Sequence, residues 1–223
     1  MNGEDPGVAS WYDDANSPHG KVPGYVPGYI PGATVSGTSR LVALPRGLVT
    51  SLGYLELATG AASLLGLSAT LRRRTLRKAL TAALHCQVPP PLRAMRHLQI
   101  GQALRLLGRY RPAVMALRRA SFDRRLRRDA LLGLAWCQRR QRDLSGAITS
   151  ITRALAASPD DGDLHYNLAC YLALAAETRA AIYELAWALE LKPRLRPRAA
   201  REPDFDSLRG ATAFETLTRA TSA

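Results

Sequence analysis

The segment 163–174, DLHYNLACYLAL, brings together three residue types that can do chemistry, namely His165, Asn167 and Cys170. Cysteine, histidine and asparagine occur together in thiol-nucleophile sites, and histidine with cysteine can hold a metal ion. In a helix, however, side chains five positions apart, such as His165 and Cys170, point about 140° away from each other. They cannot share an ion in that geometry, so we interpret the segment as a packed helix.

The rest of the chain shows no other pattern typical of catalysis or metal binding. It contains no Gly-x-x-x-x-Gly-Lys phosphate loop, no Gly-x-Ser-x-Gly elbow and no His-Glu-x-x-His motif. Three cysteines without a Cys-x-x-Cys pair do not form a disulfide framework, and the four histidines are scattered. The sequence therefore predicts a protein that is not an enzyme, with no metal and no cofactor, in a reducing compartment.

Composition favours helices, and the positive charge is concentrated in one third of the chain. Hydrophobic residues make up 47% of the 223 residues but aromatic residues only 6%, and alanine and leucine dominate. That balance is typical of packed helices rather than of a β-sandwich. Residues 72–142 carry 19 basic and 2 acidic side chains, a net charge of +17, whereas the parts before and after each carry −2. A segment of this charge attracts acidic partners.

Two regions make up the first 93 residues of the chain. Residues 1–39 hold three Pro-Gly pairs and no helical or strand period, which predicts a turn-rich tail that is disordered on its own. The region 40–93 is apolar and basic, and within it residues 47–71 carry a single charge, Glu56. The length of 47–71 is sufficient for a membrane span. Glu56 and the many Gly, Ser and Thr residues favour one or two packed helices instead.

The second half of the chain repeats itself every 34 residues, with small residues at matching positions and a proline at the end of two units. The matching positions are Gly101, Ala135 and Ala169; Ala113, Ala147 and Ala181; Leu117, Ile151 and Leu185; Ala120, Ala154 and Ala188; and the closing Pro159 and Pro193. A fixed period of this length indicates stacked helical hairpins, whose helices approach closely only where side chains are small.

These residues resemble the tetratricopeptide repeat (TPR) family, and Gly108-Arg109-Tyr110 resembles the turn between the two helices of its hairpin. The resemblance covers about residues 94–193. It implies an all-α, helical-hairpin solenoid with about three TPR-like repeats. The sequence departs from the family pattern at Arg142 and Ala176, which replace the turn glycine, and at Arg125, which replaces a closing proline.

The resemblance extends weakly in both directions. Upstream, part of 40–93 falls in the same register, which suggests a degenerate additional repeat. Downstream, residues 194–223 resemble the capping segment that closes many arrays of this family. The side chains expected to cover the last hairpin are Phe205, Leu208, Phe214 and Leu217.

In this family the first helix of each hairpin lines a concave groove that binds a peptide or a helix. Asn167 resembles the recurrent groove asparagine that binds the peptide backbone, although Trp136 could equally pack against its neighbouring hairpin. The Lys and Asn clamp of chaperone-binding members is not matched here beyond Asn167. The groove residues implied by the register are Gln99, Gln102, Arg105, Leu132, Trp136, Arg139, Arg140, Tyr166, Asn167 and Cys170.

A second candidate surface is the basic run RRASFDRRLRRD at 118–129. Its excess of positive charge favours an acidic protein partner, and we do not expect nucleic acid because, apart from Phe122, no aromatic residue interleaves with the arginines. The residues of this patch are Arg118, Arg119, Arg124, Arg125, Arg127 and Arg128.

The sequence thus favours a non-catalytic protein-interaction scaffold or adaptor in the cytoplasm. One alternative is a basic ciliary or microtubule-associated structural protein, because VPGYVPGYIPG loosely resembles Pro-Gly-Tyr motifs of ciliary microtubule-associated proteins. The other is a membrane-tethered TPR adaptor anchored through 47–71, which we do not favour.

Overall fold

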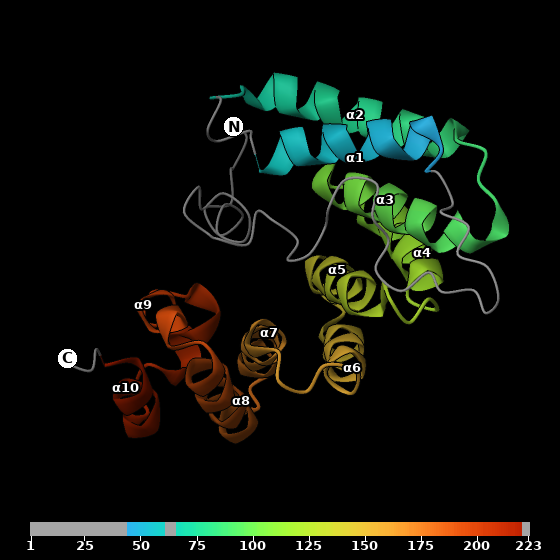
Figure 1. The fold of residues 1–223 in the computed structure, drawn as a ribbon. Coiled ribbons are helices and arrows are strands. Elements are labelled where there is room, and N and C mark those ends of the chain that lie inside the picture. The colour runs from blue at the N-terminus through green and yellow to red at the C-terminus, as the bar shows by residue number, and fades with distance from the viewer. Residues whose placement is uncertain (1–43, 61–65, 220–223) are drawn as a thin grey trace. The chain divides into compact units, whose positions relative to one another are not determined.

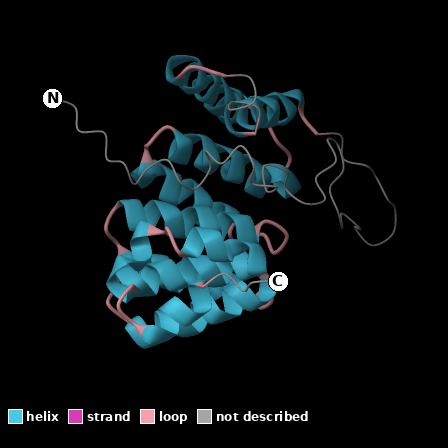
Figure 2. Ribbon diagram, turned by 90° about the vertical axis from the view of Figure 1, so that its left-hand side faces the viewer, coloured by secondary structure: helices cyan, strands magenta, loops and turns pink. Residues whose placement is uncertain are grey.

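The computed structural model describes residues 44–60 and 66–219, and these form helices joined by loops, with no strand among them, as Figure 1 and Figure 2 show. The chain divides into two compact units, Met1–Arg109 and Tyr110–Ala223, which we call the N-terminal and the C-terminal unit. The predicted tail 1–39 lies outside the described residues. No helix in the described ranges combines the length and the apolar character that a membrane crossing requires.

The first two helices of the N-terminal unit form an antiparallel pair. Arg72 on the second donates from Nε to the carbonyl of Ala58 near the end of the first, at 2.9 Å. Lys78, further along the second helix, lies 5.6 Å from the ring centroid of Tyr54, further back on the first. The elements of this unit are α1 (Arg46–Thr59), α2 (Ala69–His85), the 3-10 turn η2 (Pro90–Leu92) and α3 (Arg93–Leu106).

A small apolar cluster lies where α1, the end of α2 and η2 meet. Its buried members are Leu48 of α1, Cys86 at the end of α2 and Leu92 of η2. Gly47 lies so close to α2 that a Cβ atom there would be 2.8 Å from Cys86 Cβ. Gln99 of α3 is buried and donates from Nε2 to the carbonyl of Leu48 at 3.2 Å. The packing of α1 against the end of α2 therefore requires that Gly47 has no side chain. Its packing against α3 includes the hydrogen bond from the buried amide of Gln99.

The C-terminal unit consists of successive helices that pack on their neighbours, α4 on α5, α5 on α6, α6 on α7 and α7 on α8. The small residues that the period placed between helices, such as Ala113, Ala147 and Ala181, are fully buried, which confirms that part of the prediction. The elements are α4 (Tyr110–Ala120), α5 (Arg127–Arg140), α6 (Leu144–Leu155), α7 (Gly162–Leu174), α8 (Thr178–Leu191), η3 (Pro193–Leu195), α9 (Arg196–Ala199), η4 (Pro203–Leu208) and α10 (Thr212–Thr218).

Left-handed residues end the first helix of each predicted repeat. Gly108, Arg142 and Ala176 have φ angles of 75°, 63° and 63°. Around the second of these turns, Arg142 N–H donates to the carbonyl of Arg139 and Asp143 N–H to that of Gln138, each at 2.9 Å. This is the hydrogen-bond pattern of a Schellman motif, which satisfies carbonyls at a helix end. The turn is thus retained even where the sequence has replaced its glycine.

The segment after α8 covers the last hairpin. Its η4 packs on α7 and its α10 packs on α8. Phe205, Leu208 and Phe214 are buried, and Leu217 is half-buried. Phe205 also contacts Phe214, with ring centroids 5.8 Å apart. The apolar side of the final helix pair is therefore shielded from water.

Candidate interaction site

The predicted groove residues of α3 form hydrogen bonds within the N-terminal unit. Gln99 donates to α1, as described above, and Arg105 Nε donates to Gln102 Oε1 at 2.9 Å. Gln99 and Arg105 are buried and Gln102 is half-buried. Partner binding by these residues stays a prediction. The contact of Gln99 joins α3 to α1, whereas that of Arg105 with Gln102 lies within α3.

On α5, the predicted groove residues are half-exposed and cluster around one aromatic pair. Trp136 meets Tyr110 of α4 edge-on, with centroids 5.5 Å apart. The guanidinium of Arg140 lies 5.7 Å from the Trp136 ring and 5.8 Å from the Tyr110 ring. Trp136 therefore packs against a neighbouring helix and still retains exposed surface, so both roles considered for it are compatible with this geometry.

On α7, the predicted groove residues are buried, and the C-terminal segment packs on one of them, Tyr166. Tyr166 is 1% exposed, and its ring meets that of Phe205 edge-on at 5.6 Å. Asn167 is buried, and its Nδ2 donates to the Asp163 carbonyl of the same helix at 2.6 Å. The expectation that these side chains face an open groove does not match their burial, because Phe205 occupies the space in front of Tyr166.

A charged cluster accompanies this cover. Arg139 of α5 forms an ion pair with Asp204 of η4, and Arg198 of α9 lies over the Tyr166 ring at 5.2 Å. Burial raises the pKa of Asp204, although Arg139 opposes that shift, and burial together with Asp204 raises the pKa of Glu202. The C-terminal segment thus contacts both α5 and α7 through polar as well as apolar groups.

The histidine and the cysteine of α7 have separate environments. His165 Nδ1 lies 2.6 Å from Glu184 Oε2, and its Nε2 lies 2.7 Å from the carbonyl oxygen of Pro159. Cys170 is fully buried, and burial raises the pKa of its thiol well above the usual range. A thiol in that state is protonated and shielded, so the two side chains do not form a nucleophile pair.

The predicted basic patch is partly neutralised by acidic residues. Arg128 Nε contacts Asp161 Oδ2 at 2.7 Å and its other nitrogens approach Asp129 and Asp163. Arg125 lies 3.5 Å from Asp123. Arg127 donates to a backbone carbonyl, whereas Arg118, Arg119 and Arg124 are exposed. Only part of this patch is therefore available to an acidic partner.

A second positive surface lies on α2, outside the residues that the repeat register and the run 118–129 indicate. The described residues of the N-terminal unit include ten Lys or Arg side chains and one acidic side chain, Glu56. Arg73, Arg74 and Arg77 are exposed on α2, and none of them has a hydrogen-bond or ion-pair partner among the described residues. The signal in the sequence was the run RRRTLRK at 72–78, in which basic residues recur four positions apart.

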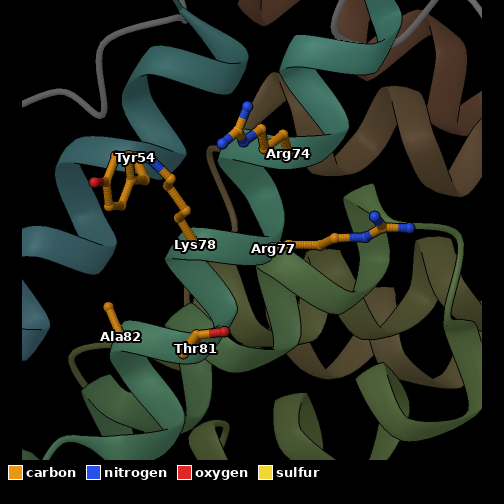
Figure 3. Close-up of a pocket in the computed structure, with 6 residues that line it drawn as sticks. All are labelled: Tyr54, Arg74, Arg77, Lys78, Thr81 and Ala82. Carbon is orange, nitrogen blue, oxygen red and sulfur yellow. The ribbon is translucent and has the colours of Figure 1, made fainter.

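Two hollows share this helix. One is lined by Tyr54, Arg74, Arg77, Lys78, Thr81 and Ala82, and Figure 3 shows Lys78 reaching toward the Tyr54 ring while Arg77 extends away from it. The other is lined by Arg73, Arg77, Leu80, Thr81, Leu107 and Arg109. Arg77 and Thr81 belong to both, so the basic face of α2 is continuous from the α1 side to the end of α3.

Comparisons with known proteins place the fold but not the function. The sequence matches no protein-family model and no curated protein. Two crystal structures of MamA, a TPR-containing protein, are similar to the chain. One covers 71% of this chain and 89% of its own at a TM-score of 0.52, the other 76% and 90% at 0.51, each with 17% identity. The chain therefore has an all-α, TPR-like helical-repeat solenoid fold.

Proposed function

We propose that this protein is a non-catalytic interaction scaffold whose helical hairpins present a basic surface to an acidic segment of a protein partner. The observation that carries this proposal is the row of unpaired cations on α2, namely Arg73, Arg74 and Arg77 with Lys78 beside them. Unpaired like charges on one helix face reduce stability, so an acidic partner that neutralises them gains affinity. The buried contacts between α1, α2 and α3 keep that face rigid.

The half-exposed cluster of Trp136 and Arg140 supplies a second contact region in this proposal. Tryptophan and arginine carry much of the energy of protein interfaces because they bury large surfaces and form several contacts. Trp136→Ala should weaken partner capture, with Trp187→Ala, on the exposed side of α8, as the matched control. If both variants captured the partner equally well, Trp136 would not be part of the binding surface.

The test compares two variants with the same change in net charge. In the first, Arg73, Arg74, Arg77 and Lys78 of α2 are changed to Gln. In the second, the exposed Arg46, Arg93, Arg153 and Arg179, which lie outside both proposed surfaces, are changed to Gln. The tagged full-length chain is used to capture proteins from a nuclease-treated native lysate, and a photo-crosslinker at position 81 marks what touches α2.

We expect the α2 variant to lose the captured proteins and the control variant to keep them, with crosslinks that map to acidic segments. Capture that is equal in both variants would contradict the proposal. So would crosslinks that map only to nucleic acid or lipid.

A further inference from the structure

The hollow between α2 and the end of α3 has the composition of an anion site. It measures about 660 Å³ and is lined by three arginines, one threonine and two leucines. The arginines are Arg73 and Arg77, one helical turn apart on α2, and Arg109, which follows α3. Among the described residues these three guanidinium groups have no hydrogen-bond or ion-pair partner.

The fold fixes where Arg109 stands. Gly108 adopts a φ of 75°, and Arg109 N–H donates to the carbonyl of Leu104 at 2.8 Å, which closes the turn after α3. At the corresponding position of the next two turns the chain has Asp143 and Glu177. An acidic residue there precedes a helix and interacts favourably with its N-terminal dipole, whereas arginine does not. Arg109 is thus unfavourable for the turn itself, and its position beside Arg73 and Arg77 adds repulsion.

The charge of the hollow indicates which anion fits it. A carboxylate carries one negative charge and would leave two of the three guanidinium groups unneutralised. A phosphomonoester carries a charge of about −1.5 to −2 near neutral pH and three strong acceptor oxygens. The guanidinium group of arginine can donate two parallel hydrogen bonds to two oxygens of a phosphate. The Thr81 hydroxyl, which lines the same hollow, is available as a further donor.

We propose that this hollow binds a phosphorylated serine or threonine side chain of a partner protein. The proposal rests on the proposed function, since it specifies the chemistry of the acidic segment at the same face of α2. The two leucines, Leu80 and Leu107, contact the aliphatic part of the bound residue. A nucleic acid is less well matched, because Tyr54, the aromatic residue of the neighbouring hollow, already has Lys78 over its ring.

The direct test uses three fluorescein-labelled peptides that are identical except for a central phosphoserine, serine or glutamate. Binding to the full-length chain is measured by fluorescence anisotropy at about 100 mM salt, where exposed charges more than about 10 Å apart are largely screened. We expect the phosphoserine peptide to bind about tenfold or more tightly than the other two. Changing Arg73, Arg77 and Arg109 together to Gln should remove that preference.

The matched control changes Arg46, Arg93 and Arg153 to Gln, which lowers the net charge equally without altering the hollow. It should keep the preference for phosphoserine within about twofold. Helix content and thermal unfolding, measured by circular dichroism, establish that both variants fold. In NMR spectra of the arginine Nε–H groups, the phosphoserine peptide should shift the signals of Arg73 and Arg77 and leave that of Arg93 in place.

Three results would overturn the inference. Equal binding of the phosphoserine and glutamate peptides would show a general acidic surface and would leave the proposed function standing. Equal losses in the two triple variants would show that net charge alone determines binding. Binding of anionic lipid vesicles or single-stranded RNA through these arginines, without binding of the phosphopeptide, would contradict both proposals.

Discussion

At the scale of single residues, the turns after α5 and α7 place ordinary side chains in left-handed backbone. Arg142 and Ala176 both have a φ of 63°. This conformation costs a residue with a Cβ about 1–2 kcal/mol, a cost that glycine avoids. Arg142→Gly and Ala176→Gly should therefore each raise the free energy of unfolding by about 0.5–1 kcal/mol, because relief of strain exceeds the added freedom of the unfolded chain. Urea denaturation measures the change.

A neighbouring position supplies the control for these glycine substitutions. Ala175 ends α7 with a φ of −85°, where a Cβ is not strained. Ala175→Gly should lower the free energy of unfolding by about 0.5–1 kcal/mol. If glycine at 142 or 176 destabilised the protein as much as glycine at 175, the left-handed turns would not be a source of strain.

Asp161 is a single residue whose charge serves two helices. It caps α7 by accepting from the N–H groups of Asp163 and Leu164, and it accepts from Arg128 Nε at 2.7 Å. Burial opposes its ionisation, but the hydrogen bond and charge of Arg128, with these backbone N–H groups, outweigh burial and lower the pKa of Asp161. The folded state therefore favours the carboxylate more strongly than the unfolded state does.

The sign of the pH dependence follows from that lowered pKa. The contribution of Asp161 is present above its unfolded pKa and is lost as the pH falls through the folded pKa. Asp161→Asn should lower the free energy of unfolding by about 1–2 kcal/mol at neutral pH, and the difference should shrink as the pH drops below about 4. Urea titrations at neutral and acidic pH measure it. Asp160→Asn, at the exposed neighbouring position, should have little effect at either pH.

At the scale of elements, the close approach of α1 and α2 depends on one of two glycines in α1. A Cβ at Gly47 would lie 2.8 Å from both Cβ and Sγ of Cys86, whereas a Cβ at Gly53 would have no neighbour within 4 Å. Gly47→Ala should therefore lower the free energy of unfolding by about 1–3 kcal/mol, because the helices must separate. Gly53→Ala should raise it by about 0.5–1 kcal/mol through helix propensity alone.

The two substitutions are chemically identical and lie on the same helix, so each serves as the other's control in thermal and urea unfolding. Opposite signs are the expected result. A stabilising effect of alanine at both positions would mean that α1 and α2 are not held at the separation described here.

The helices were largely predictable, because the packed positions of a hairpin repeat recur at a fixed spacing in the sequence. Small residues at a spacing of 34 located the buried contacts of α4, α6 and α8, and the same register located the turns at Arg142 and Ala176. The sequence also predicted that Phe205 covers the last hairpin, but the repeat register still assigned Tyr166 to an open groove. The two expectations conflict because Phe205 packs on the Tyr166 ring itself, a contact that the register does not show.

The ion pairs could not be predicted from the sequence either, because they join residues that are far apart in the chain. In the sequence, the run at 118–129 and the run at 72–78 are both rich in basic residues and look alike. Arg128 of the first run meets Asp161, a residue far along the chain, whereas Arg73 and Arg77 of the second meet no acidic group among the described residues. Tertiary contacts decide which arginines stay unpaired. The sequence therefore predicted too large a free positive surface at 118–129 and did not predict the one on α2.

At the scale of the whole molecule, a formal net charge of +13 makes stability depend on ionic strength. The repulsion is concentrated in the N-terminal unit, where Glu56 is the one acidic side chain among the described residues. Exposed charges repel over roughly 20 Å at about 20 mM salt and over roughly 6 Å at about 300 mM. Screening should therefore stabilise the folded chain, since like charges are closer together in it than in the unfolded chain.

Raising sodium chloride from about 20 to about 300 mM should increase the midpoint of thermal unfolding by roughly 2–4 °C, which corresponds to about 1 kcal/mol for a chain of this size. Changing Arg73, Arg77 and Arg109 to Gln removes charges that lie together, and it should raise the midpoint at low salt and reduce the gain from added salt. The dispersed variant at Arg46, Arg93 and Arg153 loses the same net charge and should retain most of the salt dependence. Circular dichroism melts of the three proteins measure this. A salt response that is equal in both variants would show that repulsion is spread over the chain rather than concentrated at the α2 arginines.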